Sequence, residues 1–216
     1  SVVIPTYFPG NIIKNLLNTI PDVEEILILD NGNDEELKNL LVQEFNNVTY
    51  LNTGDIGLGK TFNKAISIVK TNNIFITQPD VTLHKNCIEN LILAKSKYKN
   101  AAILAPVLYE NEKYSYYDHL DLLLNKHKKI IKRKNKNKIY CLPSGDFCVE
   151  AINSTALLVD KEKIKTINGW DDYYYTYLED VDLCYRVRKK NYEIIKIINS
   201  KVDHVGFASH KKSNYN

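Results

Sequence analysis

The strongest constraint on the fold of this chain is a regular alternation of short apolar runs and amphipathic segments in its N-terminal part. The apolar runs are typical of buried parallel strands, which we predict at Val2–Ile4, Glu25–Leu29, Val48–Leu51 and Ile74–Thr77. The segments between them have helical spacing, which predicts helices at Asn11–Ile20, Asp34–Phe45 and Lys60–Lys70. Such an alternation predicts an α/β fold with a parallel sheet and helices on both faces.

The alternation breaks after a further strand predicted at Ala101–Leu108. Beyond it we predict a strand at Thr155–Val159, a short helix at Lys161–Ile167, a final strand at Tyr192–Ile198, and a segment Val202–Val205 that carries His204. A chain of 216 residues can bury a full core. We therefore predict one continuous domain in which residues 1–108 and 109–216 form two halves around a cleft.

Composition excludes several classes of protein. The net charge of +3 is too small to indicate a nucleic-acid partner, and the 4 cysteines show no CxxC spacing, which argues against a zinc site or a dense disulfide framework. No stretch approaches the roughly 20 apolar residues of a membrane span. We expect a soluble protein in a reducing, cytoplasmic compartment. The basic run Lys126–Lys138 is either a solvated helix and loop or a surface for peripheral contact with anionic lipid on the inner face of the membrane.

Polar residues follow four of the predicted strands, at the edge of the sheet where ligands bind in such folds. The four loops are Pro5-Thr6-Tyr7, Asp30-Asn31, Gly54–Gly59 and Gln78-Pro79-Asp80. The glycine-rich loop lacks both the P-loop ending and the GxGxxG fingerprint, so neither an ATPase nor a nicotinamide enzyme is indicated. Asp80 is either a turn former or a ligand for magnesium or manganese, which take oxygen ligands and commonly bridge a carboxylate to a diphosphate.

The segment Gly169–Arg188 places acidic side chains beside a run of tyrosines. Thr176 and Glu179 have the spacing of a capping box, which predicts a helix beginning near Tyr177. Glu179 and Asp182 have structural explanations in the first turn, the latter through an ion pair with Arg186. Asp180 belongs to neither arrangement. It is either a further charge that the helix dipole favours or a rigidly held general base that takes a proton from a sugar hydroxyl.

Taken together, the motifs resemble a family 2 glycosyltransferase with the GT-A fold, in its bacterial rhamnosyltransferase-like branch. They are VVIPTY, ILDNGN, DIGLGKTFNKAI, QPDV, GWDDYYYTYLEDVDLCYRV and DHVG, in that order over nearly the whole chain. The resemblance implies a Rossmann-like, mostly parallel sheet flanked by helices, with a smaller mixed acceptor-side region. It also implies inverting transfer of a sugar from a nucleoside-diphosphate sugar to a hydroxyl of a glycan or lipid-linked acceptor, in surface polysaccharide synthesis.

The resemblance assigns roles to matching positions. Donor contacts are implied for Pro5, Thr6, Tyr7, Asp30, Asp55, Gly57, Lys60, Asn63 and Gln78. Asp80 and His204 would hold a divalent cation, Mn²⁺ or Mg²⁺, on the donor diphosphate, and Asp180 would be the catalytic base. Gln78 departs from the pattern because a first acid often stands there, which predicts weaker metal binding.

The acceptor would be oriented by Glu179 and could stack on Trp170 and Tyr173–Tyr175, whose alternative role is packing within the domain. Two other functions stay open at this point. A sugar nucleotidyltransferase would usually need a basic, glycine-rich loop after its first strand, which Pro5-Thr6-Tyr7 is not. A carbohydrate-binding or nucleotide-sugar-binding module would bind the donor without turnover.

Overall fold

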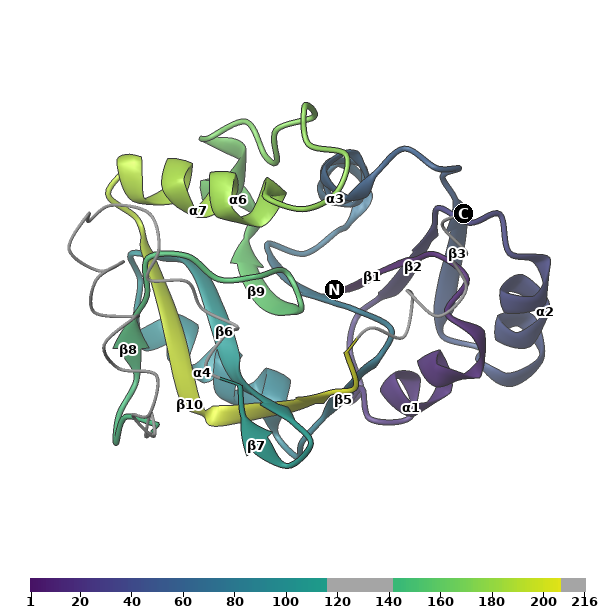
Figure 1. Cartoon of the computed structure of the whole chain (residues 1–216), viewed down its shortest axis with the longest axis horizontal. Coiled ribbons are helices and arrows are strands. Elements are labelled where there is room, and N and C mark those ends of the chain that lie inside the picture. The colour runs from purple at the N-terminus through teal and green to yellow at the C-terminus, as the bar shows by residue number, and fades with distance from the viewer. Residues whose placement is uncertain (116–141, 207–216) are drawn as a thin grey trace, which may run out of the picture.

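One sheet runs through the part of the chain that the computed structural model describes, residues 1–115 and 142–206 (Figure 1). Its parallel N-terminal section has the order β3-β2-β1-β4. These strands are β1 (Val2–Thr6), β2 (Ile26–Asp30), β3 (Val48–Asn52) and β4 (Asn73–Thr77). All four predicted strands are present, with bounds that differ from the prediction by a residue or two. Pro5 does not end β1, because it lies within the strand opposite Leu29.

The remaining strands make the sheet mixed. They are β5 (Val81–Leu83), β6 (Ala101–Glu110), β7 (Lys113–Tyr114), β8 (Phe147–Cys148), β9 (Ala156–Asp160) and β10 (Glu193–His204). β9 is antiparallel to both of its neighbours, β4 and β6, while β10 is parallel to β6 and antiparallel to β5. Strands from residues 109–216 are thus interleaved with strands from residues 1–108 in the same sheet.

Helices cover both faces of the sheet, as the alternation predicted (Figure 1). One face packs against α1 (Ile13–Leu17), α2 (Glu35–Glu44) and α4 (Cys87–Lys97), and the other against α3 (Leu58–Ile68), α6 (Lys161–Lys165) and α7 (Glu179–Lys189). Successive residues of a strand enter opposite layers: Ile4 packs in the first and Val3 in the second. Both layers are apolar, so β1 and β2 are buried along their whole length.

Two helices differ from the sequence prediction. The predicted helix Asn11–Ile20 is a 3₁₀ turn at Gly10–Ile12 followed by the short α1. Helix α4 was not predicted, although Cys87, Leu91 and Ala94 form a buried stripe at helical spacing. Its exposed Ile92 and Leu93 obscure that stripe in the sequence. No helix within the described ranges is both long and apolar enough to cross a bilayer.

Candidate active site

Asp30 organises the first polar loops from inside the protein. Its side chain is 0% exposed. One carboxylate oxygen accepts a hydrogen bond of 2.8 Å from the Gly32 amide, and the other accepts bonds of 2.6 and 2.7 Å from the Asp34 amide and the Tyr50 hydroxyl. Thr6, 2% exposed, also donates to Asp30. Both side chains are thus buried among protein partners, and their contact with the nucleoside stays a prediction.

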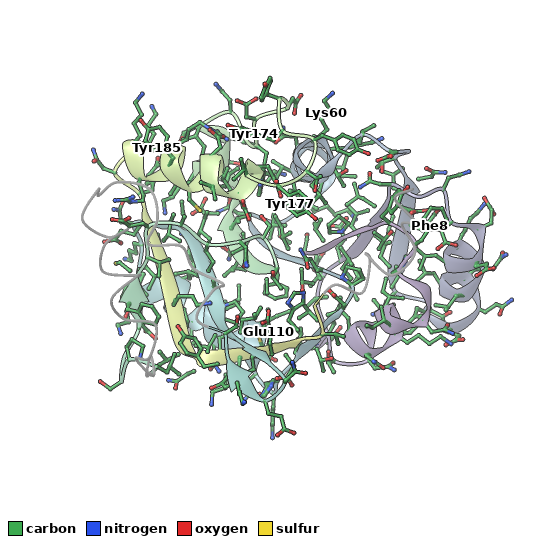
Figure 2. The ribbon with its side chains drawn as sticks, in the orientation of Figure 1. Phe8, Lys60, Glu110, Tyr174, Tyr177 and Tyr185 are labelled. Atoms are coloured by element: carbon green, nitrogen blue, oxygen red, sulfur yellow. The ribbon has the colours of Figure 1, made fainter. Side chains whose placement is uncertain are left out.

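The other residues predicted to contact the sugar donor at this edge differ in their exposure to solvent. Pro5 is buried in β1, whereas Tyr7 is 52% exposed and Asp55 is exposed in the loop before α3. Lys60 is exposed and makes no hydrogen bond or ion pair with another described residue; Figure 2 shows it at the outer edge of the molecule, beyond Tyr174. Tyr7 and Asp55 therefore stay available to a donor, and Lys60 faces solvent.

The glycine loop, Gly54–Gly59, lies directly against the tyrosine loop, which we define as Gly169–Leu178. The Leu58 amide donates to the Tyr175 carbonyl at 2.8 Å, and the Tyr175 hydroxyl donates to Asp55. Gly57 has a φ of +82°, and a Cβ there would stand 2.6 Å from the Tyr175 carbonyl oxygen. Gly57 thus permits close approach, but to protein backbone. The loops predicted to hold the donor and the acceptor are in direct contact.

Asn63 and Trp170 both make contacts within the protein. The Asn63 side-chain amide is bound to the backbone of Trp170 and to Asp172. Trp170 is 1% exposed, and its ring centroid lies 4.9 Å from that of Phe62 in the core. The packing alternative therefore describes Trp170. Exposed rings beside it are Tyr173, Tyr175 and Tyr177, which are 87%, 54% and 63% exposed.

Asp80 and His204 meet at the end of the sheet. The pairing of β5 with β10 sets His204 opposite Val81, and the Val205 amide donates to the Asp80 carbonyl at 3.1 Å. His204 Nε2 then lies 3.4 Å from Asp80 Oδ1. Burial opposes protonation of this imidazole, but the neighbouring carboxylates of Asp80 and Glu110 outweigh it and raise the pKa of His204.

Glu110 was not predicted as part of this group. It ends β6, which runs beside β10, and its carboxylate lies 3.4 Å from His204 Nδ1. The signal was present, since Glu110 follows a long apolar run as Asp80 does. Figure 2 labels Glu110 near the ends of these strands.

The residues present fit a divalent cation only in part. One carboxylate and one imidazole face each other, and Gln78 stands partly exposed two positions before Asp80 in place of a second acid. The described ranges contain no cluster of three acidic, histidine or cysteine side chains that could hold an ion alone. Magnesium and manganese commonly complete their coordination with substrate phosphates and water. Asp80 and His204 thus suit an ion that arrives with, or is shared by, a diphosphate.

Helix α7 begins two residues later than predicted and without the capping box. Tyr177 and Leu178 both have left-handed backbones, with φ of +63° and +69°, and Leu178 occupies the N-cap position with no side-chain cap. The predicted ion pair is confirmed: Arg186 lies 2.6 Å from Asp182. Left-handed conformations at non-glycine residues are strained and persist only where surrounding contacts enforce them. The start of α7 is therefore fixed by the tyrosine loop.

The adjacent carboxyl groups of Glu179 and Asp180 have unusual environments. Glu179 is 3% exposed, and its Oε2 atom has no hydrogen-bond partner among the described residues. Burial, with the charge of Asp180, raises the pKa of Glu179 to about 7. Burial also raises the pKa of Asp180, against the opposing effect of backbone amides, among them Val181 and Ser154. A carboxylate with a raised pKa is a stronger base than a solvated one.

Asp180 and Asp80 stand at the same edge of the sheet. Asp180 interacts with the amide of Ser154, just before β9. The carbonyl of the next residue, Thr155, accepts a hydrogen bond of 3.0 Å from the Gln78 amide, just after β4. Because β4 and β9 are antiparallel, the end of one adjoins the start of the other. The base candidate and the metal candidate are thus linked across two neighbouring backbones.

Comparison with known proteins agrees with this arrangement. The family model described as "Glycosyl transferase family 2" matches residues 1–151. The chain belongs to that family, and it is a glycosyltransferase with a GT-A fold.

Two proteins similar to this chain are named as rhamnosyltransferases. The N-acetylglucosaminyl-diphospho-decaprenol L-rhamnosyltransferase of Mycobacterium tuberculosis is 24% identical over 251 aligned residues, which cover 99% of this chain and 82% of that protein. Rhamnosyltransferase WbbL of Escherichia coli K12 is 26% identical over 86% of this chain and 75% of its own length.

Solved structures show the same fold at low identity. GalNAc-T7, crystallised with UDP, GalNAc and Mn²⁺, matches with a TM-score of 0.73 and 14% identity over 94% of this chain, which spans 43% of that one. Residues 1–349 of TarS from S. aureus, in complex with UDP-GlcNAc, match with a TM-score of 0.65 and 15% identity, covering 94% of this chain and 57% of that one.

Proposed function

We propose that this glycosyltransferase is an inverting enzyme that moves a sugar from a nucleoside-diphosphate sugar to a hydroxyl of a glycan or lipid-linked acceptor in surface polysaccharide synthesis. The observation that carries the proposal is the convergence of Asp180, a base with a raised pKa, and the Asp80–His204 pair on one edge of the sheet. The two named rhamnosyltransferases support a deoxyhexose such as rhamnose as the transferred sugar.

Asp180 supplies the proton acceptor for the reaction. It takes the proton of the acceptor hydroxyl as that oxygen forms a bond to the anomeric carbon, while the bond from the anomeric carbon to the diphosphate oxygen breaks. Direct displacement with a single base inverts the anomeric configuration. Asp80 and His204 would hold a bound divalent cation, whose chemistry is to stabilise the negative charge on the departing diphosphate.

The acceptor side of the proposed site is formed by Glu179 and the tyrosine loop. Glu179 has a carboxyl oxygen with no partner among the described residues, which suits a hydrogen bond to an acceptor hydroxyl. The exposed rings of Tyr173 and Tyr175 offer apolar faces on which a sugar ring can pack. On the donor side, Tyr7 and Asp55 are the exposed candidates for the nucleoside, with Gln78 beside Asp80.

A cytoplasmic location and peripheral contact with anionic lipid belong to the proposal as well. A lipid-linked acceptor would be presented at a membrane surface, and the basic run is the segment predicted to touch it. That run, Lys126–Lys138, lies outside the described residues.

The test is donor binding followed by turnover. UDP-, dTDP- and GDP-sugars are screened for a rise in melting temperature with Mn²⁺, and positive donors are then assayed for hydrolysis and for transfer to lipid-linked and glycan acceptors. Asp180→Asn is expected to lower transfer by about 10²- to 10⁴-fold and to leave donor affinity nearly unchanged. The matched control is Asp22→Asn, an exposed aspartate in the turn before β2.

Two outcomes would contradict the proposal. Near-normal turnover by Asp180→Asn would remove this residue as the base. Stabilisation by a donor without hydrolysis or transfer on a broad acceptor panel would favour a nucleotide-sugar-binding module.

A further inference from the structure

We propose that Asn63 is a positioning residue: its side chain fixes the tyrosine loop on α3 and thereby sets where Asp180 stands relative to the donor-side loops. This inference rests on the proposed function, because Asp180 must be the base for its position to matter. It assigns Asn63 a role between the two halves of the site, in place of the donor contact predicted from the sequence.

Asn63 binds the tyrosine loop through both polar atoms of its side chain. Its Nδ2 atom donates to the Trp170 carbonyl at 2.8 Å and to Asp172 Oδ1 at 2.9 Å, and its Oδ1 atom accepts from the Trp170 amide at 2.8 Å. The amide group therefore engages both the N–H and the C=O of one residue, as a neighbouring β-strand would. Two contact points on Trp170 fix its orientation as well as its distance.

Glycine residues allow α3, the helix that carries Asn63, and the tyrosine loop to approach each other closely. A Cβ at Gly169 would stand 2.2 Å from Asn63 Oδ1, and Gly169 has a φ of +69° that favours glycine. A Cβ at Gly59 would stand 3.2 Å from the Asp171 carbonyl and 3.3 Å from that of Tyr174. With Gly57 against Tyr175, the first turns of α3 contact the loop backbone at three points. The backbone of the tyrosine loop therefore has little room to shift relative to α3.

The same loop is tied to the helix that bears the base. Arg186 of α7 donates from one guanidinium nitrogen to the Ile167 carbonyl at 2.7 Å and to the Gly169 carbonyl at 2.6 Å, while it also binds Asp182. Gly169 and Trp170 are therefore held from α3 by Asn63 and from α7 by Arg186. A shift of this junction moves α7, and Asp180 lies in its first turn.

The donor-side loops meet the same junction, because α3 follows the glycine loop directly and Asp55 binds Tyr175. The contacts of Asn63 thus help to set the position of Asp180 relative to the glycine loop. Displacing a catalytic group by about 1 Å can cost about 100-fold in rate without altering the group itself.

The experiment separates placement from binding and from stability. For Asn63→Ala we expect kcat to fall by about 10- to 100-fold, with donor affinity by calorimetry within about twofold of wild type, and faster hydrogen exchange in the tyrosine loop and the first turn of α7. The control is Lys64→Ala, an exposed neighbour on α3, which is expected to behave as wild type in all three measurements.

Exchanging the amide and the carboxylate between positions 63 and 172 provides a rescue test. Asn63→Asp keeps the acceptor for the Trp170 amide but loses both donated bonds and sets a second carboxylate against Asp172. We expect Asn63→Asp to lose at least as much kcat as the alanine variant. The double variant Asn63→Asp/Asp172→Asn restores a donor–acceptor pair at 172 and is expected to recover several-fold activity over Asn63→Asp.

Three outcomes would overturn the inference. Donor affinity that weakens in proportion to kcat/KM would make Asn63 a donor ligand. Normal kcat per folded molecule would leave it a purely structural residue. Unchanged exchange in the tyrosine loop would disprove the anchoring itself, and this measurement needs no turnover. Failure of the proposed function would instead appear as absent transfer by wild type or undiminished transfer by Asp180→Asn.

Discussion

Glu179→Gln should remove a pH-dependent loss of stability that the wild type suffers above pH 5. Glu179 is 3% exposed, and burial with the adjacent Asp180 charge raises its pKa from 4.5 to about 7. The folded state therefore holds this proton more tightly than the unfolded state does. Stability that comes from the bound proton is present at low pH and is lost as the pH rises from 4.5 through 7.

The size of the effect follows from the two pKa values of Glu179. Between pH 5 and pH 8 the wild type should lose roughly 2–3 kcal/mol of unfolding free energy from this group. A glutamine side chain at this position cannot ionise, so the variant lacks this loss, although burying an amide adds a constant cost at every pH. For a protein of this size a loss of this magnitude corresponds to roughly 4–12 °C in melting temperature.

The assay is thermal unfolding of wild type and Glu179→Gln from pH 5 to pH 8 in buffers of equal ionic strength. The difference in Tm, variant minus wild type, should rise by that amount across the range. Glu89→Gln is the matched control, because Glu89 is an exposed glutamate in the first turn of α4, a helix of the same length as α7. A Tm difference that is flat with pH would refute an enclosed carboxyl group at Glu179.

Two further sites give testable expectations. Asp80→Asn should weaken donor binding in Mn²⁺ by about 10- to 100-fold, and His204→Gln should weaken it less. In calorimetry with excess EDTA, both variants should bind the donor as weakly as the wild type does. A wild-type donor affinity that is the same in EDTA as in Mn²⁺ would argue for a metal-free site. Gly57→Ala should destabilise the fold by roughly 1–3 kcal/mol more than Gly54→Ala, because both have positive φ but only Gly57 meets the Tyr175 carbonyl. Chemical denaturation measures this, and equal costs would contradict it.

Three of the four parallel strands, β1, β2 and β4, were predictable because they are buried on both sides. A strand such as Ile26–Asp30 faces an apolar layer on each side, so it appears in the sequence as a continuous apolar run. The mixed half was less predictable. β10 contains Asn199 and Ser200 between its apolar ends and was predicted as two separate segments, although it is one strand.

The start of α7 shows where local rules fail. Thr176 and Glu179 have capping-box spacing, but the box requires helical backbone from Tyr177 onward. Tyr177 and Leu178 are left-handed instead, two and three residues after Tyr175, whose carbonyl binds the first residue of α3. Local spacing cannot reveal a constraint imposed by residues more than a hundred positions away in the chain.

The sequence indicated which polar residues lie near the site, but it did not indicate which protein groups those residues would bind. Asp30 ends β2 as expected, but the polar atoms of Asp30 and Asn63 are occupied by protein partners. A sequence shows that a carboxylate or amide follows a strand, and it does not show how many donors and acceptors the fold will direct at it. The resemblance assigned Asp80 and His204 to one cation; the fold places them 3.4 Å apart, and the shared cation stays a prediction.

That contact joins the fourth polar loop to the last described strand, across 124 positions of the chain. During synthesis the parallel strands, the glycine loop and Asp80 leave the ribosome long before β10 does. A nascent chain can therefore assemble much of its nucleotide-facing side while Asp80 still lacks its imidazole neighbour. The Asp80–His204 pair, and with it the proposed diphosphate site, would then form only after β10 has been synthesised and has paired with β5.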